Sequence, residues 1–180
     1  MENTMNGAHH IIIINLARQY DHPLVLPTAF YECAQLPLST ILSTVTDDTG
    51  MKWKLSDEDL KRVLEGRDQL AERRHYQLAM FIAPYKVKTS QSCRTEDSCI
   101  TEMKETGHKL YSDWNKQHRH AVLSELDSHI GQRDICLSCV SMLEYAYEDH
   151  REKVWNDLVD IFDLHDTVTK DEWLDDDDDD

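Results

Sequence analysis

The stretch CLSCVSMLEYAYEDHREKVWNDLVDIFDL, residues 136–164, decides the fold class of this chain of 180 residues. Its apolar side chains recur at steps of three and four, which is the spacing of one face of an α-helix. They are Val140, Leu143, Tyr147, Val154, Leu158 and Ile161. The pattern predicts one long amphipathic helix over these residues, and no other part of the sequence shows it as clearly.

Two further helical segments lie near the amino terminus. Residues 8–21, AHHIIIINLARQYD, place apolar side chains on one wide helical face. A second helix is expected to begin with Asp21 as its N-cap and Pro23 in its first turn, and to end before Pro37. Together they predict a pair of helices joined by a tight break.

Capping chemistry marks a third helix in LSDEDLKRVLEGRDQL, residues 55–70. Ser56 and Asp59 resemble a capping box in which Asp replaces the usual Glu or Gln. Gly66 is the residue at which this helix is expected to break or bend, because glycine has a low helix propensity. Before this helix, the turn residues DDTG predict that residues 43–54 form a loop.

The rest of the chain and its composition complete the expected architecture. A helical pattern resumes near Cys99, continues through Leu126 and is stopped by Gly131. Gly (5) and Pro (4) are too scarce for the many turns of an all-β chain, and 40% of residues are apolar. We therefore predict an all-α fold, an irregular array of five to seven helices in a single domain over residues 1–164. Residues 165–180 lose periodicity and are strongly acidic, so a disordered tail is expected there.

The charge of the chain excludes several classes of partner. The formal net charge is −16, and without the six charges of residues 175–180 it is still −10. Nucleic acids and anionic membranes both require a basic surface, so neither is expected as a partner. The sequence has no run of about 20 apolar residues that could span a bilayer, and we see no signal peptide. The expected location is the cytoplasm or the nucleus.

Four of the five cysteines form two pairs, Cys93 with Cys99 and Cys136 with Cys139. Zinc takes four tetrahedral ligands, often from two such pairs on separate segments, and Cys-x2-Cys is an ordinary spacing for one of them. Cys-x5-Cys is longer than usual, and residues 108, 118 and 120 are histidines that can replace one cysteine. The predicted metal ligands are Cys93, Cys99, Cys136 and Cys139, which would hold a structural zinc ion.

Two other interpretations of these cysteines stay open. Cysteine is among the most frequently buried residues, so the four can be ordinary core residues or free thiols, as Cys33 on the second predicted helix is expected to be. Alternatively, Cys136 and Cys139 can act in thiol redox or zinc-dependent regulation. That role requires an exposed thiolate near positive charge, for which Arg133 is the nearby candidate.

Sequence motifs of catalysis are missing from the chain. It has no GxSxG, GxGxxG, P-loop or HExxH motif, and a site of four thiolates leaves no open position for a substrate. We therefore expect no enzyme and no catalytic residue. The expected function is that of a protein-interaction or scaffold module with a protein partner, and the acidic tail is a further candidate contact for a basic protein.

Three stretches of the chain carry a resemblance to a known family. They are NLARQYDHPLVLPTAFYECAQLPL (15–38), LSDEDLKRVLEGRDQL (55–70), and ICLSC (135–139) followed by DHREKVWNDLVDIFDL (149–164). The first matches the form LAR-x-YD-x-P-x-x-LP-x-A-x-Y. These stretches resemble the helical region that follows the BTB/POZ domain in fungal, basidiomycete-type BTB proteins, over roughly residues 10–164.

The resemblance does not extend to the BTB domain itself. Family members carry that domain ahead of the LAR-x-YD motif, whereas Met1 lies only a few residues before it here. Dimerisation and recruitment of a cullin in ubiquitin ligases belong to the BTB domain, so the resemblance does not imply them for this chain. It implies a shortened relative or an incomplete gene model.

Overall fold

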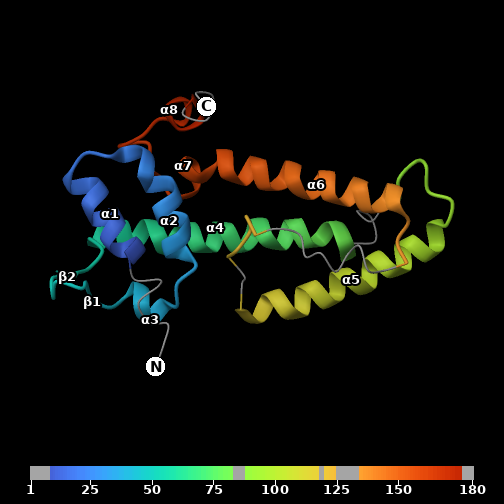
Figure 1. Cartoon of the computed structure of the whole chain (residues 1–180), viewed down its shortest axis with the longest axis horizontal. Helices are drawn as coiled ribbons and strands as arrows, with labels where there is room; N and C mark the ends of the chain where they lie inside the picture. The colour runs from blue at the N-terminus through green and yellow to red at the C-terminus, as the bar shows by residue number, and fades with distance from the viewer. Residues whose placement is uncertain (1–8, 83–87, 118–119, 125–133, 176–180) are drawn as a thin grey trace. The chain divides into compact units, whose positions relative to one another are not determined.

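The computed structural model describes residues 9–82, 88–117, 120–124 and 134–175, and within them it confirms the predicted all-α fold. The described residues form eight α-helices, one 3-10 helix and a two-stranded hairpin (Figure 1). In chain order these are α1 (His9–Gln19), η1 (Pro23–Val25), α2 (Leu26–Ala34), α3 (Leu38–Ile41), β1 (Val45–Thr46), β2 (Lys52–Trp53), α4 (Asp57–Ile82), α5 (Glu96–Gln117), α6 (Leu137–Asn156), α7 (Leu158–Ile161) and α8 (Lys170–Asp175).

The chain divides into two compact units instead of the single domain predicted over residues 1–164. The first unit comprises residues 1–69 and 156–180, and the second comprises residues 70–155. The helix count also exceeds the predicted five to seven, because α3, α7 and α8 are short helices of four to six residues. The continuous periodicity of 136–164 does not reveal the interruption at Asp157, which separates α6 from α7.

In the first unit, α1 and α2 lie side by side (Figure 1). Ile11 and Ile14 of α1 and Phe30 and Cys33 of α2 are fully buried, so the prediction that Cys33 is a core residue is confirmed. The role predicted for Asp21 is wrong. Asp21 adopts a left-handed backbone with φ 57° and closes α1, since the His22 N–H donates to the Ala17 carbonyl at 2.9 Å.

A short antiparallel hairpin lies in the segment predicted to be a loop. Val45 pairs with Trp53 and Thr46 pairs with Lys52. The carboxylate of Asp47 holds the turn, because it accepts hydrogen bonds from the Thr49 and Met51 amides at 2.9 Å and from Trp53 Nε1 at 2.7 Å. The DDTG turn was correctly recognised in the sequence, but the two-residue strands are too short to show an alternating pattern.

The capping box predicted at the start of α4 is formed in part: Ser56 caps the helix, and the Asp59 carboxylate accepts from the Ser56 hydroxyl instead of the Ser56 backbone amide. The Asp59 amide donates to Ser56 Oγ at 3.0 Å, and the Ser56 hydroxyl donates to Asp59 Oδ2 at 2.9 Å. The expected break at Gly66 does not occur, and α4 runs without interruption through Ile82.

Within the tail predicted to be disordered, residues 170–175 form the short helix α8. Thr169 and Glu172 form a reciprocal cap at the start of α8, in which the Thr169 amide donates to Glu172 Oε2 at 2.8 Å. Val168 and Trp173 are buried. These two apolar side chains anchor an otherwise acidic segment, and the run 176–180 lies outside the described residues.

The second unit combines an apolar cluster with a buried polar network. The apolar cluster contains Cys99, Met103, Ile135, Cys139, Leu143 and Tyr147. Nearby, the buried Arg74 guanidinium donates to Gln77 Oε1 at 2.7 Å and to the Tyr147 hydroxyl at 2.9 Å. The Tyr147 hydroxyl donates in turn to the Ser124 carbonyl at 3.0 Å. Tyr147 therefore belongs both to the apolar cluster and to this network.

Candidate metal centre

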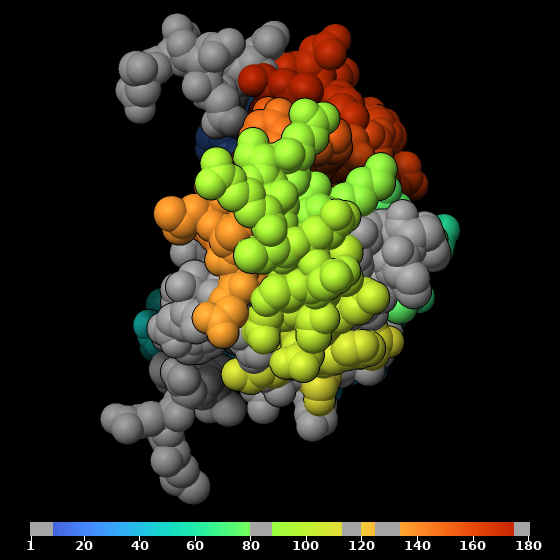
Figure 2. Space-filling model, turned by 90° about the vertical axis from the view of Figure 1, so that its right-hand side faces the viewer, coloured from blue at the N-terminus to red at the C-terminus, as the bar shows by residue number. Residues whose placement is uncertain are grey.

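Two segments of the second unit bring the four paired cysteines together. Cys93 lies in the turn before α5, and Cys99 lies in the first turn of that helix. Cys136 comes directly before α6, and Cys139 lies in the first turn of α6. Figure 2 shows the orange segment that starts at residue 134 against the yellow-green α5. Each pair therefore places one cysteine just before a helix and one in its first turn.

The four sulfur atoms form a compact group. All of them lie within 4.8 Å of one another, and the Sγ atoms of Cys93 and Cys136 are 3.8 Å apart. Ligands about 2.3 Å from a zinc ion at the corners of a tetrahedron are about 3.8 Å apart. A disulfide requires about 2.05 Å, and all five cysteines are free. The spacing therefore matches sulfur ligands around one metal ion and not a covalent pair.

Backbone amides point at two of the sulfurs. The Cys136 N–H donates to Cys99 Sγ at 3.4 Å, and the Ser90 N–H donates to Cys139 Sγ at 3.3 Å. The Thr95 hydroxyl lies 3.4 Å from Cys99 Sγ. Donors of this kind favour a thiolate over a thiol, and a metal ion favours it further.

The pKa values of the two buried cysteines follow from these contacts. The amide of Cys136 and the hydroxyl of Thr95 lower the pKa of Cys99 to about 7. Burial raises the pKa of Cys139 to about 12, although the Ser90 amide opposes that change. At neutral pH the metal-free cluster therefore retains protons, and binding a metal ion would release them.

Burial separates the cluster into an inner and an outer pair. Cys99 and Cys139 are fully buried, whereas Cys93 and Cys136 are half-buried. The apolar side chains around the inner pair lie on the same two helices and just before α6, and they are Met103, Ile135 and Leu143. Water is thus excluded from one side of the site, which lowers the local dielectric and strengthens the attraction between thiolates and a cation.

The structure brings together all four cysteines that the sequence named as metal ligands. The described histidines among the proposed substitutes, His108 and His120, are not part of this group, and His118 lies outside the described residues. Sequence reasoning missed Ser90 and Thr95, which hold the sulfurs through a backbone amide and a hydroxyl. A threonine directly before a helix carries an N-cap signal, but nothing in the sequence marks the Ser90 amide as a donor to sulfur.

Comparisons with known proteins give no relative for this chain. No family model, curated protein or solved structure matches it. Among the described residues, no helix combines the length and the apolar character required to cross a membrane.

Proposed function

We propose that this chain is a non-catalytic protein-interaction module in which one structural zinc ion holds the second unit together. The observation that carries the proposal is the group of four thiols within 4.8 Å of one another. A tetrahedral set of four sulfur ligands is typical of zinc or of iron–sulfur centres, and zinc requires no redox chemistry from the protein. Four protein ligands leave no position for water or substrate, so the ion would be structural.

The zinc ion would connect the turn before α5 to the beginning of α6. Cys93 and Cys136 are 43 positions apart in the sequence. Holding two such distant segments together has an entropic cost that grows with the length of the loop between them. Metal binding offsets this cost and contributes directly to the free energy of folding, because the assembled site exists only in the folded chain.

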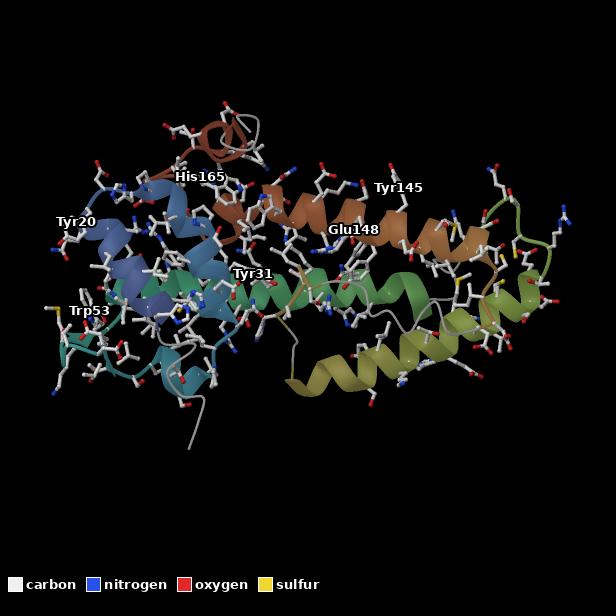
Figure 3. The ribbon with its side chains drawn as sticks, in the orientation of Figure 1. Tyr20, Tyr31, Trp53, Tyr145, Glu148 and His165 are labelled. Carbon is white, nitrogen blue, oxygen red and sulfur yellow. The ribbon has the colours of Figure 1, made fainter. Side chains whose placement is uncertain are left out.

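Three features support an interaction function. Helical surfaces present side chains to partners. On α6, Leu137 is 85% exposed and Tyr145, labelled in Figure 3, is 77% exposed. The net charge of −16 disfavours nucleic acids and anionic membranes as partners. The resemblance of residues 10–164 to the helical region of fungal BTB proteins also fits a scaffold. We place the protein in the cytoplasm or nucleus, where reducing conditions keep thiols available for a metal.

A second candidate function is thiol-based redox regulation through Cys136 and Cys139. It is favoured by the half-buried position of Cys136, whose sulfur lies 3.8 Å from that of Cys93. Iodoacetamide at neutral pH distinguishes the two functions. Selective labelling of Cys136 in the protein as purified would favour redox chemistry, whereas protection of all four cysteines until a chelator is added would favour a structural metal.

Elemental analysis of protein purified without a histidine tag tests the zinc proposal. We expect about one zinc ion per chain, and loss of that zinc in a Cys136→Ser/Cys139→Ser double variant with a large drop in melting temperature. Cys33→Ser is the matched control, since Cys33 is fully buried but belongs to the other unit. It should keep its zinc. A metal-free wild-type protein whose double variant melts at the same temperature would contradict the proposal.

A further inference from the structure

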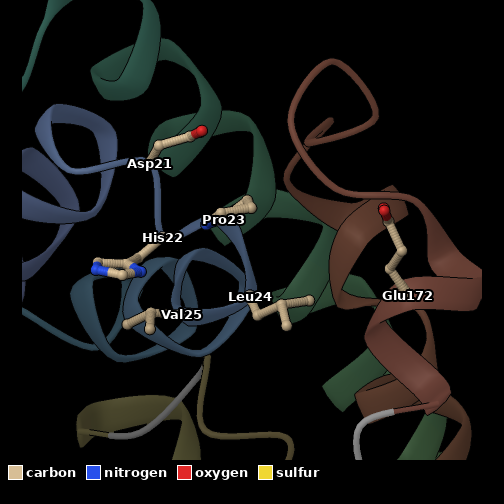
Figure 4. A pocket seen from close by; sticks show the side chains of 6 residues that line it. All are labelled: Asp21, His22, Pro23, Leu24, Val25 and Glu172. Atoms are coloured by element: carbon tan, nitrogen blue, oxygen red, sulfur yellow. The ribbon is translucent and has the colours of Figure 1, made fainter.

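The first unit has a surface cavity of about 360 Å³ that lies outside the metal centre. One wall is the turn that connects α1 to α2, and the other is formed by α8 (Figure 4). The residues that line it are Asp21, His22, Pro23, Leu24, Val25 and Glu172. All of them belong to the first unit, so the cavity is formed within one compact body.

Part of the lining of the cavity is apolar and accessible. Leu24 and Val25 are 36% and 46% exposed, although Leu26, the next residue, is fully buried. Tyr20, just before the cavity residues, is 62% exposed (Figure 3). Three of the nine exposed large apolar residues in the described part of the chain therefore fall within residues 20–25. Such a local concentration of apolar surface is typical of binding sites.

Both walls are fixed before any ligand arrives. The left-handed backbone of Asp21 is held by the bond from the His22 amide to the Ala17 carbonyl, and the ring of Pro23 fixes the next turn. On the opposite wall, Glu172 accepts hydrogen bonds from the Thr169 amide at 2.8 Å and from the Thr169 hydroxyl at 2.9 Å. A preformed cavity loses little conformational entropy when it binds a ligand.

The rim of the cavity carries negative charge. Asp21 and Glu172 are its two carboxylates, and its lining includes no lysine or arginine. The cations on neighbouring elements bind other carboxylates. Lys170 pairs with Asp157 at 2.8 Å, and Arg18 pairs with Asp59 at 2.9 Å. The rim is therefore complementary to a positively charged ligand.

We propose that this cavity binds a short segment of a partner protein in which an aliphatic side chain is flanked by lysine or arginine. The aliphatic side chain would pack on Leu24 and Val25, and the flanking cations would lie near Asp21 and Glu172. The proposal rests on the proposed interaction function and names the chemistry of the partner. An acidic segment would be repelled by the same two carboxylates.

Titration of the full chain, labelled with 15N, tests this inference with two peptides. The probes are Ac-Gly-Arg-Leu-Arg-Gly-NH2 and its counterpart with glutamate in place of both arginines. We expect the basic peptide to shift the amide signals of Asp21, His22, Leu24, Val25 and Glu172 in a saturable way, and to bind more weakly as salt is added. The acidic peptide should cause no such shifts.

Variants test separately the charged contact at Asp21 and the apolar contact at Leu24. Asp21→Asn tolerates the left-handed backbone and removes one charge, so it should weaken binding of the basic peptide about 3- to 10-fold at low salt. Leu24→Ser should weaken it at least as much, whereas Leu42→Ser, at a residue that is 55% exposed elsewhere in the unit, should not. Signal dispersion in each spectrum reports whether the variant is folded.

The inference is overturned if the basic peptide causes no saturable shifts, if the shifts lie elsewhere, or if both peptides bind equally. A zinc measurement on the same sample separates this failure from a failure of the proposed function. If the protein contains zinc but does not bind the basic peptide, only the cavity inference is refuted. If the protein contains no metal but binds the peptide, only the structural zinc is refuted.

Discussion

Gly66 of α4 packs directly against the ring of Phe162, so that a Cβ atom at position 66 would overlap the Cε1 and Cδ1 atoms of that ring. Phe162 is fully buried and also faces Phe30, with the two ring centroids 5.5 Å apart. The glycine therefore admits an aromatic side chain to the core of the first unit. Its role is close packing and not flexibility of the helix.

Gly66→Ala should destabilise the protein although alanine is the better helix former. Higher helix propensity contributes about 1 kcal/mol in favour of the variant, but overpacking of a core typically costs about 1–3 kcal/mol. The new Cβ would lie far inside van der Waals contact with Phe162 Cε1, so the packing cost should exceed the propensity gain. We expect a net loss in the free energy of unfolding, measured by urea denaturation. Asp68→Ala, at an exposed position of the same helix, should change stability by no more than about 0.5 kcal/mol.

A double variant checks the mechanism of that loss. Phe162→Leu removes the ring atoms that a new Cβ would meet, so the cost of Gly66→Ala should shrink in its presence. Equal costs of Gly66→Ala with phenylalanine and with leucine at position 162 would show that the contact is not the cause.

The same glycine shows how far the sequence predicts this fold. The start of α4 was predicted correctly because the N-cap is a local signal, and Ser56 Oγ does accept the Asp59 amide. The break expected at Gly66 was wrong because the residue that explains the glycine, Phe162, is 96 positions away. Helix propensity is a property of the local sequence, so it does not reflect a contact between residues that are so far apart in the chain. Likewise, the burial of Trp173 in an acidic segment depends on a surface made by the rest of the unit.

Asp59→Asn should destabilise the first unit by about 2–3 kcal/mol, because it weakens charged hydrogen bonds in a mostly buried group. The Asp59 carboxylate accepts a hydrogen bond from Arg18 at 2.9 Å and lies 3.7 Å from Arg62. Asp57→Asn is the control, since its side chain is 99% exposed. Thermal melts of the two variants should differ clearly, and similar melts would show that the ion pair with Arg18 contributes little.

The hairpin should lose stability at acidic pH through Asp47. Hydrogen bonds from the Thr49 and Trp53 side chains lower the pKa of Asp47 from 3.8 to about 2. Because the pKa is lower in the folded state, its contribution to stability is fully present above about pH 3.8 and is lost as the pH falls towards 2. The difference in unfolding free energy between wild type and Asp47→Asn should therefore be larger at pH 5 than at pH 2. A difference that does not vary with pH would contradict this assignment.

Removal of the proposed metal should loosen the backbone around the cysteines. The amides of Ser90 and Cys136 donate to sulfur atoms, so a chelator should accelerate their hydrogen exchange as the site opens. The amides of Thr49 and Met51 are internal controls, because they donate to Asp47 in the other unit. Unchanged exchange at Ser90 and Cys136 after complete removal of the metal would mean that the ion does not hold these segments.

The sequence predicted which four cysteines come together, but not the contacts that surround their sulfur atoms. Spacing identified Cys136 and Cys139 because a pair three residues apart is a recurrent ligand pattern. The second pair, Cys93 and Cys99, has an unusual spacing, and its assignment depended on the number of ligands that zinc requires. The Ser90 and Cys136 amides donate to sulfurs of the other cysteine pair because residues 90–99 contact residues 136–139 in the folded chain. A local sequence pattern gives no information about such a contact.

The positions of the four cysteines also set an order of events during synthesis. A nascent chain that has been made only as far as α5 has Cys93 and Cys99 but lacks the other pair. A metal ion could gain its full set of ligands only after Cys139 has left the ribosome. Metal binding would therefore complete the second unit late in synthesis, in one step that joins Cys93 and Cys99 to Cys136 and Cys139. A chain whose synthesis stopped before that point would expose the thiols of Cys93 and Cys99 without a metal ion.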